Sequence, residues 1–152
     1  MEKIVIYTDG GSRGNPGPAG IGVVIADGKG KMMKEYSNFL GVKTNNEAEY
    51  EAVIFGLRKI KALLGKEKIK DCEFEVRMDS ELVARQLGGA YKIENEKLAH
   101  LFLKIWNLKV DFGKIYFKHI PREQNREADR LANEAMDGNT NSNLKSKISK
   151  LF

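Results

Sequence analysis

The chain of 152 residues has a single cysteine, Cys72, so it cannot form an intrachain disulfide. A chain without disulfides fits a reducing compartment, and we predict a cytoplasmic location. The longest apolar run, near residues 21–26, is too short for a membrane span, which needs about 20 residues. The sequence opens directly on a strand pattern, so we expect neither a signal peptide nor a membrane partner.

Acidic residues are absent from the end of the chain. The last fifteen residues, 138–152, contain three lysines and no acid, so residues 1–137 carry 23 basic and 21 acidic side chains. This body is nearly balanced, and charge alone therefore does not argue for a nucleic-acid partner. We predict one catalytic domain over 1–137, followed by a polar, basic and flexible tail over 138–152, in a monomeric protein.

Hydrophobic periodicity predicts an α/β protein with elements in the order β-β-β-α-β-α-α-β-α. Strand patterns lie near 4–7, 21–26, 31–40, 73–78 and 115–119, and helical patterns near 46–64, 80–87, 95–109 and 124–136. A meander of three strands followed by alternating strands and helices implies a mixed five-stranded sheet with helices on both faces. Trp106, the only tryptophan, is expected in the core or beside a groove.

Four acidic residues stand in distinctive local contexts, each expected where a strand ends or a helix begins: Asp9, Glu49, Asp79 and Asp129. Glu49 lies four residues before Val53 and so shares the inward face of its helix, which its neighbour Glu47 does not. Two unit charges about 4 Å apart repel by on the order of 4 kcal/mol at an effective dielectric near 20. If these acids lie together, divalent cations would offset the repulsion between them, and oxygen ligands favour Mg²⁺ or Mn²⁺.

The contexts of these acids form four motifs in order: Tyr-Thr-Asp-Gly-Gly-Ser, Thr-Asn-Asn-x-x-Glu, Asp-Ser and Asn-x-x-Ala-Asp-x-Leu-Ala. With these motifs, the chain from about Lys3 to Met136 resembles type 1 ribonuclease H. The resemblance implies a ribonuclease H-like fold. It also implies an endoribonuclease that hydrolyses the RNA strand of RNA–DNA hybrids, leaving a 5′-phosphate and a 3′-hydroxyl.

By the same resemblance, the four acids hold two Mg²⁺ ions, with Mn²⁺ as a possible substitute. Asp9 would bridge both ions and Asp129 would hold the ion that activates water. Glu49 and Asp79 would hold the ion beside the leaving 3′-oxygen. The resemblance further assigns RNA contacts to Asn15, Asn45 and Asn46, and a DNA phosphate contact to Thr44.

Two departures from the family pattern concern the residues around the acids. Many members have a mobile histidine before the last motif, and His119 occupies that position without the usual glycine-rich loop. Either His119 or Arg122 is therefore expected to assist catalysis. Many bacterial members also insert a basic protrusion after the second helix, which the short segment Gly88–Lys92 excludes here.

Other functions remain open at this point. One alternative is a related nuclease acting on double-stranded RNA or another structured nucleic acid. Another is a nucleic-acid-binding module with weak activity. The tail resembles a degenerate sliding-clamp-binding peptide, with Ile148, Leu151 and Phe152 as anchors and Lys145 in place of the leading glutamine. Its alternative is a solvated basic tail.

Overall fold

The computed structural model describes residues 2–138. The three expected clamp anchors, Ile148, Leu151 and Phe152, lie outside the described residues. The strands are β1 (Glu2–Ser12), β2 (Gly17–Asp27), β3 (Met32–Lys43), β4 (Cys72–Met78) and β5 (Lys114–His119). The helices are α1 (Asn45–Asp71), α2 (Glu81–Leu87), α3 (Glu96–Val110) and α4 (Arg126–Gly138), with a 3-10 turn η1 (Arg122–Gln124) before α4.

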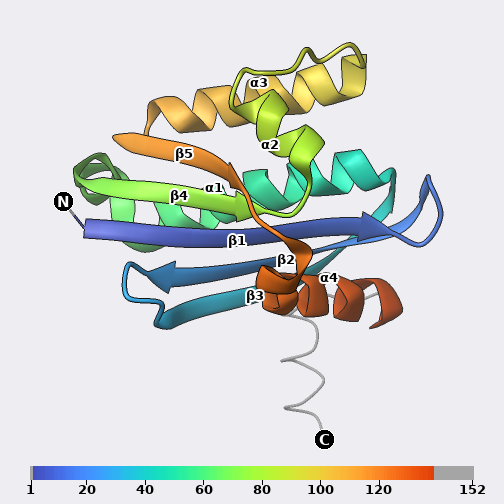
Figure 1. The fold of residues 1–152 in the computed structure, drawn as a ribbon, viewed down its shortest axis with the longest axis horizontal. Coiled ribbons are helices and arrows are strands. Elements are labelled where there is room, and N and C mark those ends of the chain that lie inside the picture. Colours follow the sequence, from blue (N-terminus) through green and yellow to red (C-terminus); the bar gives the residue numbers. More distant parts are fainter. Residues whose placement is uncertain (1, 139–152) are drawn as a thin grey trace, which may run out of the picture.

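The strands form one mixed five-stranded sheet in the order β3-β2-β1-β4-β5 (Figure 1). β1, β2 and β3 are antiparallel neighbours, whereas β4 runs parallel to both β1 and β5. The predicted fold class and element order are therefore confirmed. In the described part of the chain, no helix has the length and apolar character needed to cross a membrane.

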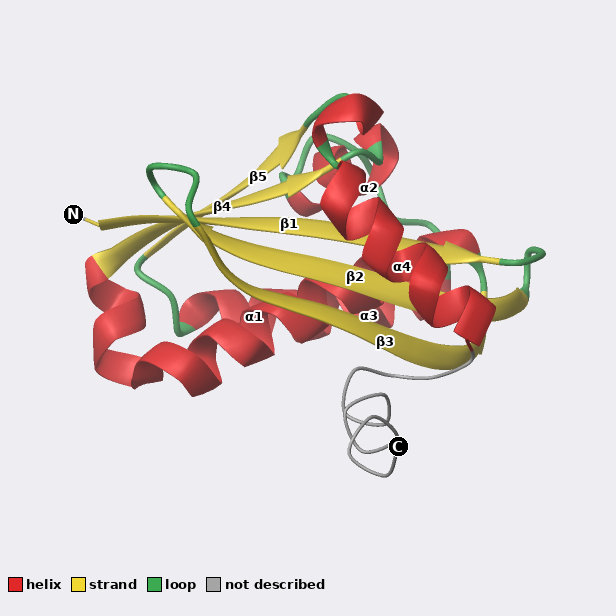
Figure 2. Ribbon diagram, turned by 90° about the horizontal axis from the view of Figure 1, so that it is seen from below, coloured by secondary structure: helices red, strands yellow, loops and turns green. Residues whose placement is uncertain are grey.

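Helices cover both faces of the sheet, with α1 and α3 on one side and α4 on the other (Figure 2). The two faces alternate along β2. A Cβ atom at Gly22 would lie 2.0 Å from the carbonyl oxygen of Ala128, so α4 lies this close to β2 only because the residue is glycine. The next residue, Val23, faces the other way and packs in the main core with Leu57 of α1.

The prediction that Asp9 ends its strand is wrong. β1 pairs with β4 as far as Tyr7, but it pairs with β2 as far as Ser12. Gly10 and Gly11 lie beyond the strand pattern expected near 4–7, yet they continue the antiparallel ladder by pairing with Ile21 and Gly20. Asp9 therefore lies inside β1, yet beyond the point where the parallel pairing stops, and its side chain borders the end of β4.

Three further expectations need correction. The helix predicted over 46–64 continues to Asp71 after a break at Gly65, whose φ of 84° favours glycine. The last helix begins at Arg126, because the preceding residues form the 3-10 turn. Trp106 is not in the core: it is 52% exposed on α3, whose buried residues are Leu98, Leu101 and Ile105.

Candidate active site

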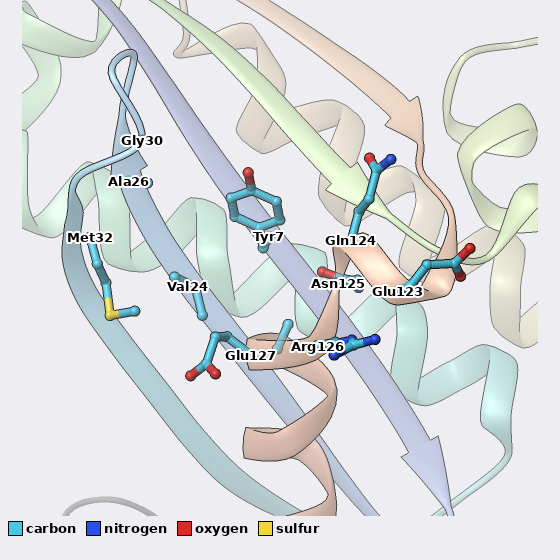
Figure 3. A pocket seen from close by; sticks show the side chains of 11 residues that line it. Tyr7, Val24, Ala26, Gly30, Met32, Glu123, Gln124, Asn125, Arg126 and Glu127 are labelled. Atoms are coloured by element: carbon cyan, nitrogen blue, oxygen red, sulfur yellow. The ribbon is translucent and has the colours of Figure 1, made fainter.

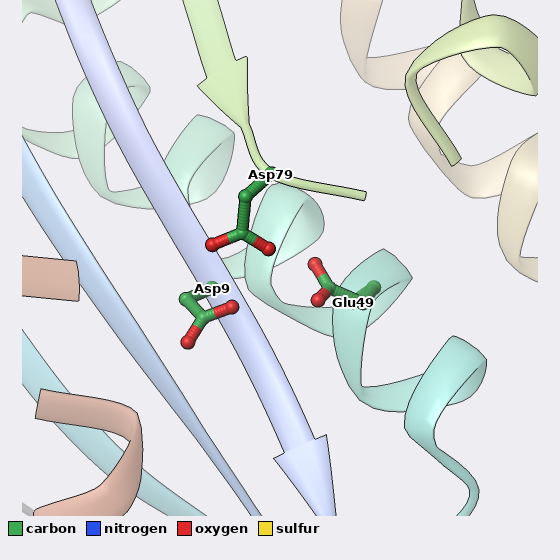
Figure 4. Close-up of side chains that lie close together, drawn as sticks. All are labelled: Asp9, Glu49 and Asp79. Atoms are coloured by element: carbon green, nitrogen blue, oxygen red, sulfur yellow. The ribbon is translucent and has the colours of Figure 1, made fainter. Parts of the chain in front are cut away.

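Three of the four acids converge at one end of the sheet. Asp9 comes from β1, Asp79 directly follows β4, and Glu49 comes from the start of α1 (Figure 4). One carboxylate oxygen of each lies within 4.8 Å of those of the other two. Asp9 and Glu49 are buried and Asp79 is half-buried. The structure therefore brings together residues that are far apart in the sequence and that repel one another when ionised.

The start of α1 determines which glutamate enters the site. Thr44 caps the helix: its hydroxyl accepts a hydrogen bond from the Glu47 amide at 3.1 Å, and the Glu47 carboxylate accepts one from the Thr44 amide at 3.0 Å. This reciprocal capping box holds Glu47 at the helix end. Glu49, two residues later, points to the sheet, as its helical position predicts.

Close contact between α1 and β1 brings Glu49 to Asp9. A Cβ atom at Gly10 would lie 2.2 Å from the carbonyl oxygen of Ala48, so only glycine permits this approach. The Gly10 backbone also interacts with the Glu49 carboxylate and opposes the rise of its pKa, while Glu49 Oε2 is buried without a hydrogen-bond partner among residues 2–138. Such an unpartnered buried oxygen is expected of a ligand to a cation.

Asn125 is a residue of the site that the sequence reasoning missed. Its side-chain nitrogen donates to the carbonyl oxygen of Thr8 at 2.9 Å and to the Asp79 carboxylate at 3.1 Å. It is only 1% exposed and directly precedes α4. Asn125 therefore connects β1, Asp79 and the helix that carries Asp129. Its place as the first residue of the last motif was the available signal.

Asp129 lies in the first turn of α4, and its carboxyl group is in hydrogen-bonding contact with that of Asp9. Burial raises the pKa of Asp9 to about 8, helped by the negative charge of Asp79 and by the contact with Asp129, while the positive charge of Arg122 opposes the shift. Burial also raises the pKa of Glu49 well above its usual value. The negative charges of Asp9 and Asp79 raise it further. Asp129 thus lies against the cluster of Asp9, Glu49 and Asp79 through its contact with Asp9.

These shifts predict how the metal-free protein responds to pH. Between about pH 4 and about pH 8, the folded state holds a proton on Asp9 that the unfolded chain has released. Stability therefore falls as pH rises through this window, because the folded state binds more protons than the unfolded state. Urea unfolding in EDTA, from pH 5 to pH 9, measures the effect as a falling free energy of unfolding.

A matched comparison assigns this pH dependence to the cluster. Asp9→Asn should flatten the fall in unfolding free energy, whereas Glu47→Gln should leave it as in the wild type, because Glu47 lies outside the cluster. Mg²⁺ added at high pH should restore stability to the wild type more than to Asp9→Asn. An unfolding free energy that rises with pH from 5 to 8 in EDTA would contradict the prediction.

The donor set fits hard divalent cations. It consists of carboxylate oxygens, which Mg²⁺ and Mn²⁺ prefer, and contains no thiol or imidazole. The unpartnered Oε2 of Glu49 and the raised pKa of Asp9 both indicate oxygens arranged for positive charge. Asp9, Glu49 and Asp79 would hold a metal ion together, and Asp129 lies against Asp9 for a second.

A polar groove of about 620 Å³ lies at the start of α1, the helix that carries Glu49, and it is lined by the four expected substrate contacts, Asn15, Thr44, Asn45 and Asn46. Asn15 accepts a hydrogen bond from the Asn45 amide at 2.9 Å, and the Asn45 side-chain oxygen accepts one from the Ser12 amide at 2.9 Å. The start of α3, with Asn95 and Lys97, forms the opposite wall and was not predicted to take part.

The two candidates for an assisting residue occupy different positions. His119 is exposed at the end of β5, where it pairs in register with Met78. Arg122, in η1, acts on Asp9 through its positive charge. The segment Gly88–Asn95 joins α2 to α3 directly, so the described chain has no protrusion between these helices.

A second pocket, of about 210 Å³, lies on the α4 side of the sheet (Figure 3). Its walls include Tyr7, Val24 and Met32 together with Arg126 at the start of α4. None of the four acids lines it, and its surface is mostly apolar. Its one link to the site is Asn125, which lines the pocket and also holds Asp79.

Several known proteins are similar to this chain in sequence. Residues 7–135 match the family model described as Reverse transcriptase-like. The Bifunctional protein Rv2228c of Mycobacterium tuberculosis is 42% identical over 137 residues, which cover 89% of this chain but 36% of that protein. Ribonuclease HI of Halobacterium salinarum is 40% identical over 135 residues, covering 89% of this chain and 65% of that protein.

A solved structure agrees over nearly its whole length. LC11-RNase H1, determined in complex with an RNA/DNA hybrid, has a TM-score of 0.84 and 51% identity, covering 89% of this chain and 97% of that one. The match to the family model spans most of the chain, including all four acids. The chain therefore belongs to the Reverse transcriptase-like family, among the type 1 ribonucleases H.

Proposed function

We propose that the protein is an endoribonuclease that hydrolyses the RNA strand of RNA–DNA hybrids, using two divalent metal ions and leaving a 5′-phosphate and a 3′-hydroxyl. The observation that carries this proposal is the cluster of Asp9, Glu49 and Asp79, whose oxygens lie within 4.8 Å of one another. LC11-RNase H1, at 51% identity, binds such a hybrid in its crystal structure. Mg²⁺ is the proposed metal, with Mn²⁺ as its substitute.

The side chains of the cluster have distinct parts in this proposal. When bound, the two ions would supply an activated water and stabilise charge on the phosphate and the leaving oxygen. Asp9 would contribute to both metal positions, with Asp129 at one and Glu49 and Asp79 at the other. Asn125 fixes the orientation of the Asp79 carboxylate by its hydrogen bond of 3.1 Å. Arg122, rather than His119, is our candidate for the assisting residue, because its charge already acts on Asp9.

The groove at the start of α1 supports recognition of the RNA strand. The hydrogen bonds of Asn15 and Asn45 within the protein use their amide oxygens, which leaves the NH₂ groups to donate to a ligand. Donors at this position suit 2′-hydroxyl groups, which distinguish RNA from DNA in a minor groove. Asn46 would contribute to the same strand, and Thr44 would contact a phosphate of the DNA strand.

A panel of labelled substrates tests the proposal. We expect an RNA–DNA hybrid to be cut with Mg²⁺ or Mn²⁺ and not in EDTA, while single-stranded RNA stays intact. Product ends identified by mass should carry 5′-phosphates. Faster cleavage of double-stranded RNA would instead favour the related-nuclease alternative. Binding of the hybrid without cleavage in either metal would indicate a nucleic-acid-binding module.

Further proposals concern the protein as a whole. We propose that residues 1–137 form the catalytic domain and that the chain acts as a monomer in the cytoplasm. The buried free thiol of Cys72 is consistent with a reducing compartment. Binding of a sliding clamp through Ile148, Leu151 and Phe152 stays a prediction from the sequence, which a pull-down with and without residues 145–152 tests.

A further inference from the structure

The outer face of α3 carries an exposed apolar stripe. Leu103, Trp106 and Val110 are 55%, 52% and 70% exposed. They follow one another at spacings of three and four residues, which places them on one side of the helix. The opposite side packs into the core. Exposed apolar surface that forms a contiguous stripe indicates an interaction site more than a packing defect.

Trp106 is at the centre of a group of rings and a cation. Its ring stacks beside that of Phe102, with centroids 6.3 Å apart and planes inclined by 25°. The Lys109 ammonium lies 5.5 Å from the Trp106 centroid and 5.9 Å from that of Phe117 on β5. Phe102 and Phe117 pack against the core, whereas Trp106 is half open to solvent. The surface therefore presents an aromatic ring beside a positive charge.

The segment that builds this surface is strongly basic. Residues 97–119 include most of α3 and all of β5, and they contain five lysines and one acidic residue, Asp111. The Asp111 carboxylate is bound to the Lys61 ammonium of α1 at 2.6 Å, so it does not neutralise the lysines. Lys109 is the lysine of this segment that lies against Trp106, whereas Lys114 and Lys118 alternate with Phe117 along β5 and therefore point to the other face of the sheet.

β5 links the surface to the catalytic edge of the sheet. His119, its last residue, is the register partner of Met78, which directly precedes Asp79. Phe117 lies two residues earlier, about 7 Å along the strand. Figure 1 shows β5 at the edge of the sheet, and the contact between Lys109 and Phe117 connects this strand to the end of α3. A polymer that leaves the catalytic acids along β5 would therefore reach Phe117, Lys109 and Trp106 in turn.

We infer that α3 and β5 form an accessory site for single-stranded nucleic acid, such as an unpaired flank of the hybrid. A base stacks on Trp106, and the Lys109 ammonium beside the ring contacts a phosphate. Stacking on an aromatic ring accepts any base, since every base has a π-face. A second copy of the chain or a protein partner would use the apolar stripe but would gain nothing from the Lys109 charge beside the Trp106 ring. The inference rests on the proposed function in that the strand belongs to its substrate.

Because Trp106 is the only tryptophan of the chain, the intrinsic fluorescence of the protein reports binding at this site directly. The full-length protein is titrated in EDTA with a fluorescein-labelled oligothymidylate of about 15 nucleotides. We expect the anisotropy to rise with the oligonucleotide, and an unlabelled strand to quench Trp106 fluorescence. Trp106→Ala should weaken binding by about tenfold, and Trp106→Phe by less, because phenylalanine keeps a ring for stacking. Lys109→Gln should reduce the salt dependence of binding.

Leu103→Ala is the matched control, because it removes apolar surface from the same stripe without removing a ring. It should leave oligothymidylate binding unchanged. Equal binding by the wild type and Trp106→Ala, without quenching, would overturn the inference. A dimer seen by light scattering that Leu103→Ala dissociates would also overturn it and would assign the stripe to a second copy.

Cleavage measurements separate this inference from the proposed function. A blunt hybrid should be cut equally well by the wild type and Trp106→Ala, because Trp106 lies outside the acid cluster. A hybrid with a single-stranded flank should have a lower KM than the blunt one for the wild type, and this gain should disappear in Trp106→Ala. If the wild type binds oligothymidylate but cuts no hybrid, the proposed function fails while the accessory site stands.

Discussion

Asp9→Asn should lower Mg²⁺-dependent cleavage of an RNA–DNA hybrid by at least about a thousandfold, while the protein stays folded. Asp9 is the acid that lies close to all the others. One of its carboxylate oxygens lies within 4.8 Å of an oxygen of Glu49 and of Asp79, and its carboxyl group contacts that of Asp129. Asparagine keeps the shape of the side chain but removes the charge that a cation needs. Initial cleavage rates of an end-labelled hybrid measure the effect.

Although Asp9→Asn should lose activity, its folded state should be more stable than that of the wild type when no metal is bound. In EDTA at about pH 8, Asp9→Asn should unfold at a higher urea concentration than the wild type, because it removes like-charge repulsion from a buried site. Asp27→Asn is the control for loss of a carboxylate elsewhere in the sheet. The Asp27 carboxylate accepts hydrogen bonds from the Lys29 and Lys31 amides at 2.9 Å each, so this variant should lose some stability and keep its activity. Cleavage by Asp9→Asn at the wild-type rate would refute the assignment of the site.

Glu49→Gln and Glu47→Gln should differ sharply, although the two residues are separated by one alanine. Glu49→Gln should lower cleavage by at least about a hundredfold, since the buried Oε2 loses its charge and the metal its ligand. Glu47→Gln should keep nearly full activity and lose well under about 1 kcal/mol of stability, because glutamine also completes a capping box. The pair is compared by cleavage rate at saturating Mg²⁺ and by urea unfolding.

A second measurement distinguishes loss of metal from loss of fold. Calorimetric titration with Mg²⁺ should show weaker binding for Glu49→Gln and unchanged binding for Glu47→Gln. If Glu47→Gln loses as much activity as Glu49→Gln, the choice of Glu49 as ligand is wrong. The two variants have the same chemistry in the same helix, so a difference between them reports position alone.

Much of this site followed from local sequence patterns. Counting four residues back from Val53 correctly placed Glu49 on the inward face of α1, and the pattern of β4 placed Asp79 just beyond its end. The inference succeeds because helical and strand periodicity are local properties. The roles of these residues in catalysis remain predictions, to be decided by the variants above.

What the sequence did not reveal depends on contacts between distant segments. Asn125 bonds to Thr8 and Asp79, and Gly10 admits the carbonyl group of Ala48, yet neither contact leaves a periodic signal. Asp9 was placed at a strand end because glycines normally favour turns, whereas pairing with β2 keeps them extended. Trp106 was expected in the core or beside a groove because it lies next to core positions of α3, but half of its side chain is exposed to solvent.

The order in which the chain is synthesised gives one feature of the site a further meaning. Asp9 belongs to the first strand and Asp129 to the last helix, and Asn125 ties the two ends of the domain through Thr8. A nascent chain still lacking α4 has no complete set of acids, whatever it has already folded. The proposed nuclease therefore becomes complete only when the last helix of the domain has packed against its first strand.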